Sequence, residues 1–239
     1  MPNLCGKESY DCNDLIKIFG ILRSPEGCPW DRAQDHHTIR NNFLEEAYEA
    51  VEAIDLESSA LLREELGDVL LQIALHSQME AEQGHFDFND VCPGICRKMI
   101  GRHPHIFGSE YAANAAEAAQ NWEQQKRKEK GLYSLEDRLR QVSGALPALM
   151  RAQKLISRAA ASGCFEDPND GMLRNCLEDA LLADETDVQG WSRLLFLVCE
   201  RMERLGISAE EALSRESDRM IECFLEMQHS EKPTEGRSL

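Results

Sequence analysis

The sequence contains no apolar run that approaches the roughly 18 residues needed to cross a membrane, and it has little glycine, proline or basic charge. Only 15 glycines and 8 prolines interrupt its 239 residues, and alternating runs of Val, Ile, Thr and Tyr are missing, which disfavours a β-sheet protein. Lysine and arginine total 26 against 43 aspartates and glutamates, so the formal net charge is −17. This acidity argues against nucleic acid and membranes as partners, because nucleic acid and anionic lipid both attract basic surfaces.

The nine cysteines are scattered through the chain, and their number is odd. The first twenty residues carry acidic side chains and show no signal-peptide pattern. Dispersed cysteines without an export signal are typical of reduced thiols and not of a disulfide framework, so we expect a cytoplasmic protein. The chain is long enough to bury a core without disulfides or metals, in one large domain or two small ones.

Helical periodicity dominates the first half of the chain and predicts four helices in an all-α fold. The first, over residues 42–56, carries one apolar stripe. The second, over 61–82, is apolar nearly all round, as expected for a buried helix. The third starts after the turn at Gly84 and ends by Gly101, and the fourth covers 112–130. The stripe of the first helix comprises Phe43, Ala47, Ala50, Val51 and Ile54.

Composition and helix signals divide the chain into four parts. We expect an N-terminal helical domain at 1–130 and a connector at 131–147. A second helical domain should follow at 148–229, and a polar tail at 230–239. Asp87 or Asn89 is the expected N-cap of the third helix, and Ser208 opens the last helix with a capping-box pattern. The run Asp68–Leu71 has a counterpart in Arg193–Phe196, and each run is followed by a helix and a glycine. This echo favours a tandem repeat.

Carboxylates at helical spacing occur on both of the first two predicted helices. Glu46 and Glu49 are i, i+3 neighbours on the first helix, as Glu65 and Asp68 are on the second. Antiparallel helices lie about 8–10 Å apart, so the two pairs can converge. Four carboxylates in a partly buried seam repel one another unless protons or a cation lie between them. Oxygen ligands favour Mg²⁺ or Mn²⁺ over zinc, and Gly67 leaves room for a ligand or a close backbone approach.

Two acidic motifs stand fifteen residues apart: Glu45-Glu46-x-x-Glu49 and Glu65-x-x-Asp68. Together they resemble the signature of the MazG family of nucleoside triphosphate pyrophosphohydrolases. Other stretches resemble family landmarks in the same order, namely Gly27–Asp31, Gly84–Asp90, Arg102–Phe107 and Trp122-Glu123-x-x-Lys126. The resemblance is close over about residues 12–130, and Leu146–Lys154 resembles the junction to a second MazG repeat.

The resemblance implies an all-α helical bundle that hydrolyses nucleoside triphosphates to the monophosphate and pyrophosphate with Mg²⁺, for which Mn²⁺ can substitute. The family pairs subunits or repeats into four-helix bundles, so a homodimer is expected. The implied metal ligands are Glu46, Glu49, Glu65 and Asp68. Glu45 is the implied catalytic residue, which orients the attacking water.

The resemblance also implies a set of residues that bind the substrate. Lys98, Arg102 and Lys126 would contact the phosphates of the nucleoside triphosphate, and Trp122 would line the nucleotide pocket. Trp122 and Lys126 are i, i+4 neighbours, so they share one helix face. Gly101 departs from the family pattern, because a second basic residue often precedes the equivalent of Arg102.

The second half departs further from the family pattern. In the run Glu178–Leu182, Leu182 stands where a third acidic residue is expected. In the run Gly190–Arg193, Arg193 stands at the position of the metal-binding aspartate, and an arginine cannot hold Mg²⁺. We therefore expect a degenerate, catalytically inactive MazG repeat with a structural, dimerising or regulatory role.

Two other functions compete with this interpretation. A di-iron carboxylate bundle requires two Glu-x-x-His pairs, but the sequence offers only Glu82-x-x-His85, which Gly84 interrupts. The second alternative is a non-catalytic nucleotide-sensing or helical interaction module that keeps the Mg²⁺ site without turnover. Release of pyrophosphate would distinguish the enzyme from this module. A serine hydrolase is not supported, because no Gly-x-Ser-x-Gly motif occurs.

Overall fold

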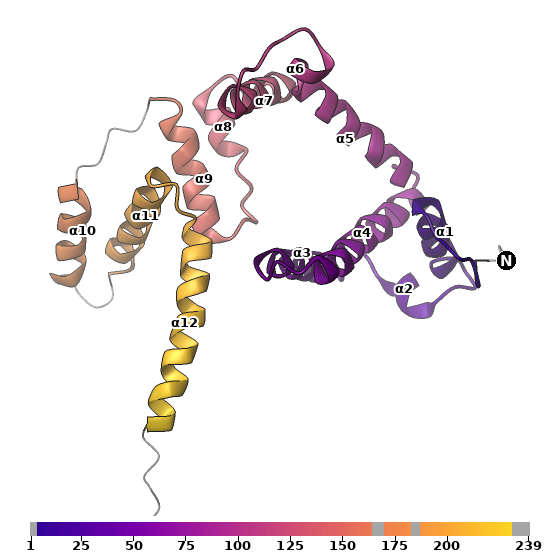
Figure 1. Ribbon diagram of the computed structural model, residues 1–239, viewed down its shortest axis with the longest axis horizontal. Helices are drawn as coiled ribbons and strands as arrows, with labels where there is room; N and C mark the ends of the chain where they lie inside the picture. The colour runs from indigo at the N-terminus through magenta and orange to yellow at the C-terminus, as the bar shows by residue number, and fades with distance from the viewer. Residues whose placement is uncertain (1–3, 164–169, 183–186, 231–239) are drawn as a thin grey trace, which may run out of the picture. The chain divides into compact units, whose positions relative to one another are not determined.

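The computed structural model of the protein describes residues 4–163, 170–182 and 187–230. In these ranges all regular secondary structure is helical, which confirms the all-α class (Figure 1). None of these helices is both long enough and apolar enough to span a lipid bilayer. The chain forms two compact units, Met1–Glu123 and Gln124–Leu239, and the boundary between them falls inside helix α7.

Within residues 4–123, the N-terminal unit contains six helices and the start of a seventh. These are α1 (Cys12–Leu22), α2 (Pro29–Ala33), α3 (Arg40–Asp55), α4 (Ser59–Glu82), α5 (Phe88–Arg102), α6 (Pro104–Phe107) and α7 (Ala115–Lys130). Helices α3, α4, α5 and α7 confirm the four predicted helices, with ends shifted by a few residues. The short helices α1, α2 and α6 were not predicted. Asp87 is the N-cap of α5 and forms a capping box with Asp90, which decides between the two predicted caps.

The described part of the C-terminal unit contains the rest of α7 and five further helices. These are α8 (Leu135–Arg140), α9 (Ala148–Ala160), α10 (Asp170–Leu182), α11 (Val188–Arg204) and α12 (Ala209–Ser230). Helix α8 lies in the segment predicted as a connector, and it packs against α9. The predicted tail, apart from Ser230, lies outside the described residues. The four-part domain division and the tandem repeat stay predictions.

Helices α3 and α4 form the most extensive helix pair of the described chain. Ser58 begins α4, because its side chain accepts a hydrogen bond of 3.3 Å from the Leu61 N–H. Ala50 and Ala53 are the buried residues of α3, and their small side chains let the two helices approach closely. The pair therefore holds polar side chains of α3 and α4 opposite one another.

The core of the N-terminal unit lies around the second half of α4. Its buried members are Phe19, Ile39, Ala74, Leu75 and Met79. Arg23 strengthens this region, since its guanidinium donates to both oxygens of Glu82 at 2.8 and 2.9 Å. The same group donates to the carbonyls of Asp31 and Gln34, so the loop that contains α2 is held beside α4.

The apolar stripe predicted for α3 is only partly buried. Ala50 is buried, but Val51 and Ile54 are 50% and 57% exposed, and Phe43 is also exposed. The prediction of a helix α4 buried all round is wrong as well, because Leu66 is 54% exposed. Both corrections have one cause. Helix α3 contacts α4 through the narrow face that carries Ala50 and Ala53, and the larger apolar side chains lie on either side of this contact.

The core of the C-terminal unit lies between α9, α11 and the start of α12. Ile156, Cys199 and Ala209 are its buried members. Gln153 joins these helices, because its amide donates to the Ile207 carbonyl and accepts from the Ala209 N–H, both at 2.7 Å. The predicted cap Ser208 accepts from the Glu211 N–H at 3.4 Å.

Replacement of Gln153 by leucine should destabilise the protein by about 1–3 kcal/mol, because the buried Ala209 N–H loses its partner and the part-buried Ile207 carbonyl loses a hydrogen bond. The free energy of unfolding from urea titration measures this loss. Gln141→Leu is the matched control, since Gln141 is exposed and receives only a 3.4 Å contact from Lys130. Equal losses in the two variants would show that the Gln153 hydrogen bonds do not stabilise the unit.

Candidate functional site

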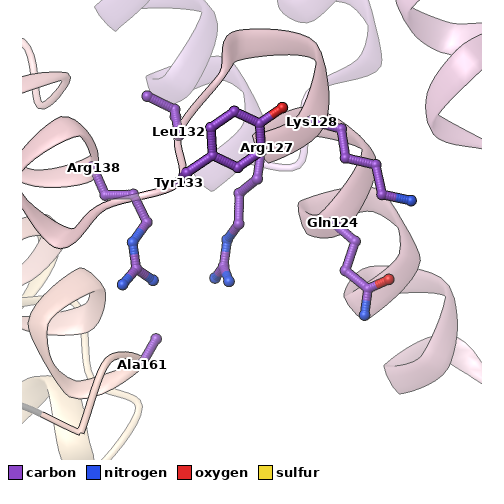
Figure 2. Close-up of a pocket in the computed structure, with 7 residues that line it drawn as sticks. All are labelled: Gln124, Arg127, Lys128, Leu132, Tyr133, Arg138 and Ala161. Carbon is purple, nitrogen blue, oxygen red and sulfur yellow. The ribbon is translucent and has the colours of Figure 1, made fainter.

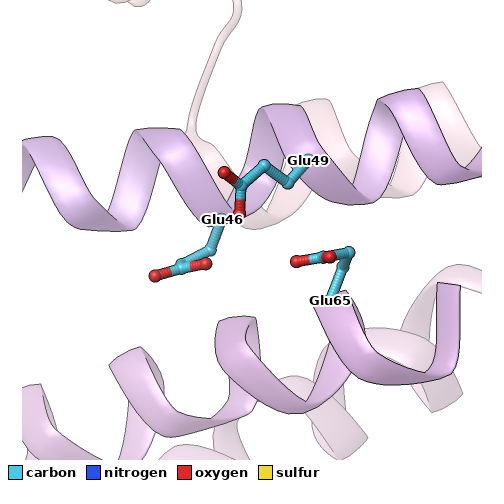
Figure 3. A group of neighbouring side chains, drawn as sticks. All are labelled: Glu46, Glu49 and Glu65. Atoms are coloured by element: carbon cyan, nitrogen blue, oxygen red, sulfur yellow. The ribbon is translucent and has the colours of Figure 1, made fainter. Parts of the chain in front are cut away.

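Three glutamates converge across the α3–α4 pair. Each of Glu46, Glu49 and Glu65 offers one carboxylate oxygen, and these three oxygens all lie within 4.8 Å of one another. Figure 3 shows Glu46 and Glu49 on α3 facing Glu65 on α4. We call these three side chains the carboxylate group. In the part of the chain that the structure describes, no other cluster of acidic, histidine or cysteine side chains meets this geometry.

Burial and mutual repulsion raise the pKa values of two members of this group, Glu46 and Glu65. Loss of hydration raises the pKa of Glu46, and the charges of Asp68 and Glu49 raise it further. Burial likewise raises the pKa of Glu65, and Glu49 and Asp68 again contribute. No lysine or arginine among the described residues forms an ion pair with the group. No ion pair within the described residues therefore compensates its negative charge.

The structure places Asp68 beside the carboxylate group without including it. Asp68 lies one helical turn after Glu65, half-buried, and its charge acts on both Glu46 and Glu65. Glu45, the predicted catalytic residue, is exposed on α3 and does not join the group. Gly67 has no heavy atom within 4 Å of the position of an added Cβ, so it makes no close backbone approach.

Gln72 belongs to the site but was missed in the sequence. Its side chain is 5% exposed on α4, and it hydrogen-bonds to Glu46, which lowers the pKa of that carboxyl and partly offsets the repulsion. The Gln72 Oε1 atom is buried and has no hydrogen-bond partner. A signal was available, because Gln72 interrupts the apolar run of α4 and follows Asp68 by four residues.

These side chains fit a hard divalent cation. Carboxylate oxygens are the ligands that Mg²⁺ and Mn²⁺ prefer. A cation bound by Glu46, Glu49 and Glu65 would neutralise the repulsion that raises the pKa values of Glu46 and Glu65. The unpartnered Gln72 Oε1 is an acceptor for water in the shell of such an ion.

The predicted substrate residues lie on α5 and α7, and two of them contact each other. Arg102, at the end of α5, lies with its guanidinium 5.1 Å from the centroid of the Trp122 ring, in a cation–π contact. The His103 ring makes an edge contact with Trp122 at 4.9 Å. Figure 1 shows α5 leading away from the α3–α4 pair. Lys98 is exposed on α5, and Lys126 lies one turn beyond Trp122 on α7.

The side chains required for a di-iron bundle are engaged elsewhere. Glu82 pairs with Arg23 at 2.8 Å, and His85 pairs with Glu80 at 2.8 Å. The interrupted Glu82-x-x-His85 motif therefore does not form a metal-binding pair.

Comparison with known proteins identifies relatives over most of the chain. Residues 34–107, which include all members of the carboxylate group, match the family described as MazG nucleotide pyrophosphohydrolase domain. The chain is 36% identical over 230 residues to the nucleoside triphosphate pyrophosphohydrolase of Escherichia coli (strain K12), covering 90% of this chain and 86% of that protein.

Two further relatives extend the comparison. The chain is 34% identical over 221 residues to the nucleoside triphosphate pyrophosphohydrolase/pyrophosphatase MazG of Thermotoga maritima, covering 90% of this chain and 84% of that protein. It is 39% identical over 152 residues to the nucleoside triphosphate pyrophosphohydrolase of Mycobacterium tuberculosis, covering 63% of this chain and 45% of that protein.

Replacing Glu46 by glutamine should raise the melting temperature of the metal-free protein at neutral pH. The folded state raises the pKa of Glu46, so its charged form opposes folding above that pKa. The gain should vanish as the pH falls below the ordinary glutamate pKa of about 4.3, where the carboxyl is protonated in both states. Thermal unfolding in EDTA across this range measures the effect.

Glu52→Gln provides the control for this experiment, because Glu52 is exposed on the same helix and lies outside the carboxylate group. It should leave the melting temperature unchanged. Addition of Mg²⁺ should stabilise the wild type and the control more than Glu46→Gln. A lower melting temperature for metal-free Glu46→Gln would contradict the repulsion inferred at this site.

Proposed function

The chain belongs to the MazG family of nucleotide pyrophosphohydrolases, and we propose that its carboxylate group is the centre at which nucleoside triphosphates are hydrolysed. The reaction consumes one water, cleaves the anhydride bond between the α- and β-phosphates, and releases a nucleoside monophosphate and pyrophosphate. The convergence of three carboxylate oxygens within 4.8 Å is the observation that carries this proposal.

The cofactor of this reaction is Mg²⁺, with Mn²⁺ as a substitute. Glu46, Glu49, Glu65 and Asp68 hold the ion, and Gln72 keeps Glu46 oriented. When bound, the ion neutralises phosphate charge and activates water. Such neutralisation is required, because a triphosphate adds several negative charges to a site whose carboxylates already repel one another.

The remaining roles fall on side chains outside the carboxylate group. Glu45 orients the attacking water. Lys98, Arg102 and Lys126 contact the phosphates, and Trp122 lines the nucleotide pocket. The contact between Arg102 and Trp122 supports this assignment, because it places a cation against an aromatic face.

The exposed apolar side chains of α3 and α4 support a homodimer. Leu44, Tyr48, Val51, Ile54 and Leu66 are all exposed on this helix pair. Apolar patches of this kind mark association surfaces. A second copy packed on the pair would complete a four-helix bundle and bury these side chains. We place the enzyme in the cytoplasm, with nucleoside triphosphates and no nucleic acid polymer or membrane as partners.

The C-terminal unit has a role other than hydrolysis. Leu182 is exposed at the end of α10, and Arg193 stands on α11, where acidic residues would be needed. Among the described residues of this unit, no cluster of acidic side chains approaches the geometry of the carboxylate group. A structural, dimerising or regulatory role therefore follows.

Glu49→Gln should lower the rate of pyrophosphate release on the order of 100-fold, the size of effect seen when one charge-stabilising group is lost. The measurement is a panel of nucleoside triphosphates assayed for pyrophosphate with Mg²⁺, Mn²⁺ or EDTA. EDTA should abolish the wild-type activity, and the exposed Glu52→Gln should retain it.

Equal rates for wild type and Glu49→Gln would remove the proposed mechanism. The non-catalytic alternative makes a different prediction for the same assay, because a nucleotide-sensing module would bind nucleotide with Mg²⁺ and release no pyrophosphate from any member of the panel.

Val51→Glu should convert the homodimer to a monomer, since a buried unpaired charge at the new interface costs several kcal/mol. Light scattering after size-exclusion chromatography measures the mass of each species. Val91→Glu is the matched control, because Val91 lies on α5, away from the proposed interface, and is also exposed. A wild-type protein that runs as a monomer would refute the dimer.

A further inference from the structure

The C-terminal unit contains a pocket of about 400 Å³ beside the end of α7 (Figure 2). Its walls come from the last turns of α7, the turn that follows, α8 and the end of α9. The lining residues are Gln124, Arg127, Lys128, Leu132, Tyr133, Arg138 and Ala161. Pockets for small organic ligands have volumes of about 300–1,000 Å³, so this one is large enough for a small molecule.

The lining of this pocket has the opposite charge to the chain as a whole. Three of its seven residues are cationic and none is acidic, in a protein with a formal net charge of −17. Arg127 is half-buried and Lys128 is exposed, and neither forms an ion pair within the described chain. Basic side chains left without counter-ions in such an acidic protein provide the charge that an anionic ligand needs.

The turn after α7 fixes the geometry of the pocket. Gly131 has a φ of +63°, which ends the helix. The N–H groups of Gly131 and Leu132 donate to the carbonyls of Lys128 and Arg127 at 3.3 and 3.0 Å. These bonds satisfy the last carbonyls of the helix. Leu132 is buried, and the following residue, Tyr133, is 81% exposed with its ring beside the pocket (Figure 2).

Arg138 is held in position before any ligand arrives. Its guanidinium donates to the hydroxyl of Ser162, and its backbone carbonyl accepts from Arg158. The Arg138 Nε–H is buried and has no hydrogen-bond partner. Figure 2 shows the guanidinium groups of Arg127 and Arg138 pointing in the same direction. A ligand that accepts hydrogen bonds from both would therefore meet one donor, Arg138, that is already ordered.

We propose that this pocket binds a nucleotide, with its phosphates on Arg127, Lys128 and Arg138 and its base on Tyr133. Arginine forks match phosphate oxygens, and an exposed aromatic ring offers a stacking surface to a base. The site is separate from the proposed substrate residues of α7. At 3.6 residues per turn, Arg127 and Lys128 project from the opposite side of the helix to Trp122 and Lys126.

The test is a calorimetric titration of the full chain with ATP, AMP and pyrophosphate in EDTA, where hydrolysis does not proceed. ATP should bind the wild type. Arg127→Gln and Lys128→Gln should each weaken ATP binding by roughly tenfold or more, as expected for loss of a charge-assisted hydrogen bond. Tyr133→Ala should weaken the binding of ATP but not of pyrophosphate, and AMP should bind more weakly than ATP.

Arg215→Gln and Lys154→Gln are controls matched in charge, because both residues are exposed in the same unit and neither lines the pocket. They should bind ATP like the wild type. Absence of ATP binding, or equal weakening in the controls, would overturn the proposal. ATP binding that is no tighter than pyrophosphate binding and that Tyr133→Ala leaves unchanged would refute the nucleotide assignment in favour of free pyrophosphate.

Glu49→Gln separates this pocket from the proposed hydrolytic centre. In EDTA it should bind ATP as tightly as the wild type does, because the pocket uses no carboxylate and no metal. Loss of ATP binding in Glu49→Gln would instead place the nucleotide at the carboxylate group and overturn the proposal. A failure of the pyrophosphate assay would leave the titration result unaffected.

Discussion

Repulsion among carboxylates across the α3–α4 pair is the constraint on which the N-terminal unit depends. Ala50 and Ala53 bring the helices close, and this approach forces Glu46, Glu49 and Glu65 together. Gln72 offsets only part of the repulsion, since the pKa of Glu46 remains raised. Packing therefore favours the association of α3 with α4, whereas repulsion between their carboxylates opposes it. A divalent cation would remove this repulsion, so metal binding and folding stability are linked.

The same helix pair connects the chemistry to assembly. Close packing along a narrow alanine edge leaves large apolar side chains, such as Val51 and Leu66, on the outside. One copy of the chain therefore presents acidic residues in the interface of the pair and apolar residues around it. A second copy would bury the apolar side chains without neutralising the acidic ones. Cation binding would thus relieve the electrostatic repulsion within the helix pair, and the proposed dimer would bury its exposed apolar side chains.

The site in each unit is lined by side chains of opposite charge. The N-terminal unit concentrates carboxylates that require a cation, whereas the pocket of the C-terminal unit collects Arg127, Lys128 and Arg138. Under the two proposals made above, the phosphates of a nucleotide would bind a metal ion at the first site and basic side chains at the second. Leu182 and Arg193, which stand where the predicted repeat would need acidic residues, agree with the proposal that this unit does not hydrolyse nucleotides.

The sequence by itself determined the helical class, the positions of α3, α4, α5 and α7, and the spacing of the acidic residues, because each depends on local periodicity along one helix. Tertiary structure decided which face every helix buries. It left Val51 exposed and placed Gln72 against Glu46, outcomes that depend on the helix opposite and not on the residues in sequence. Tertiary structure alone also formed the basic pocket. That site depends on the turn at Gly131 and on the contact between Arg138 and Ser162, and no local sequence pattern around either residue predicts this contact.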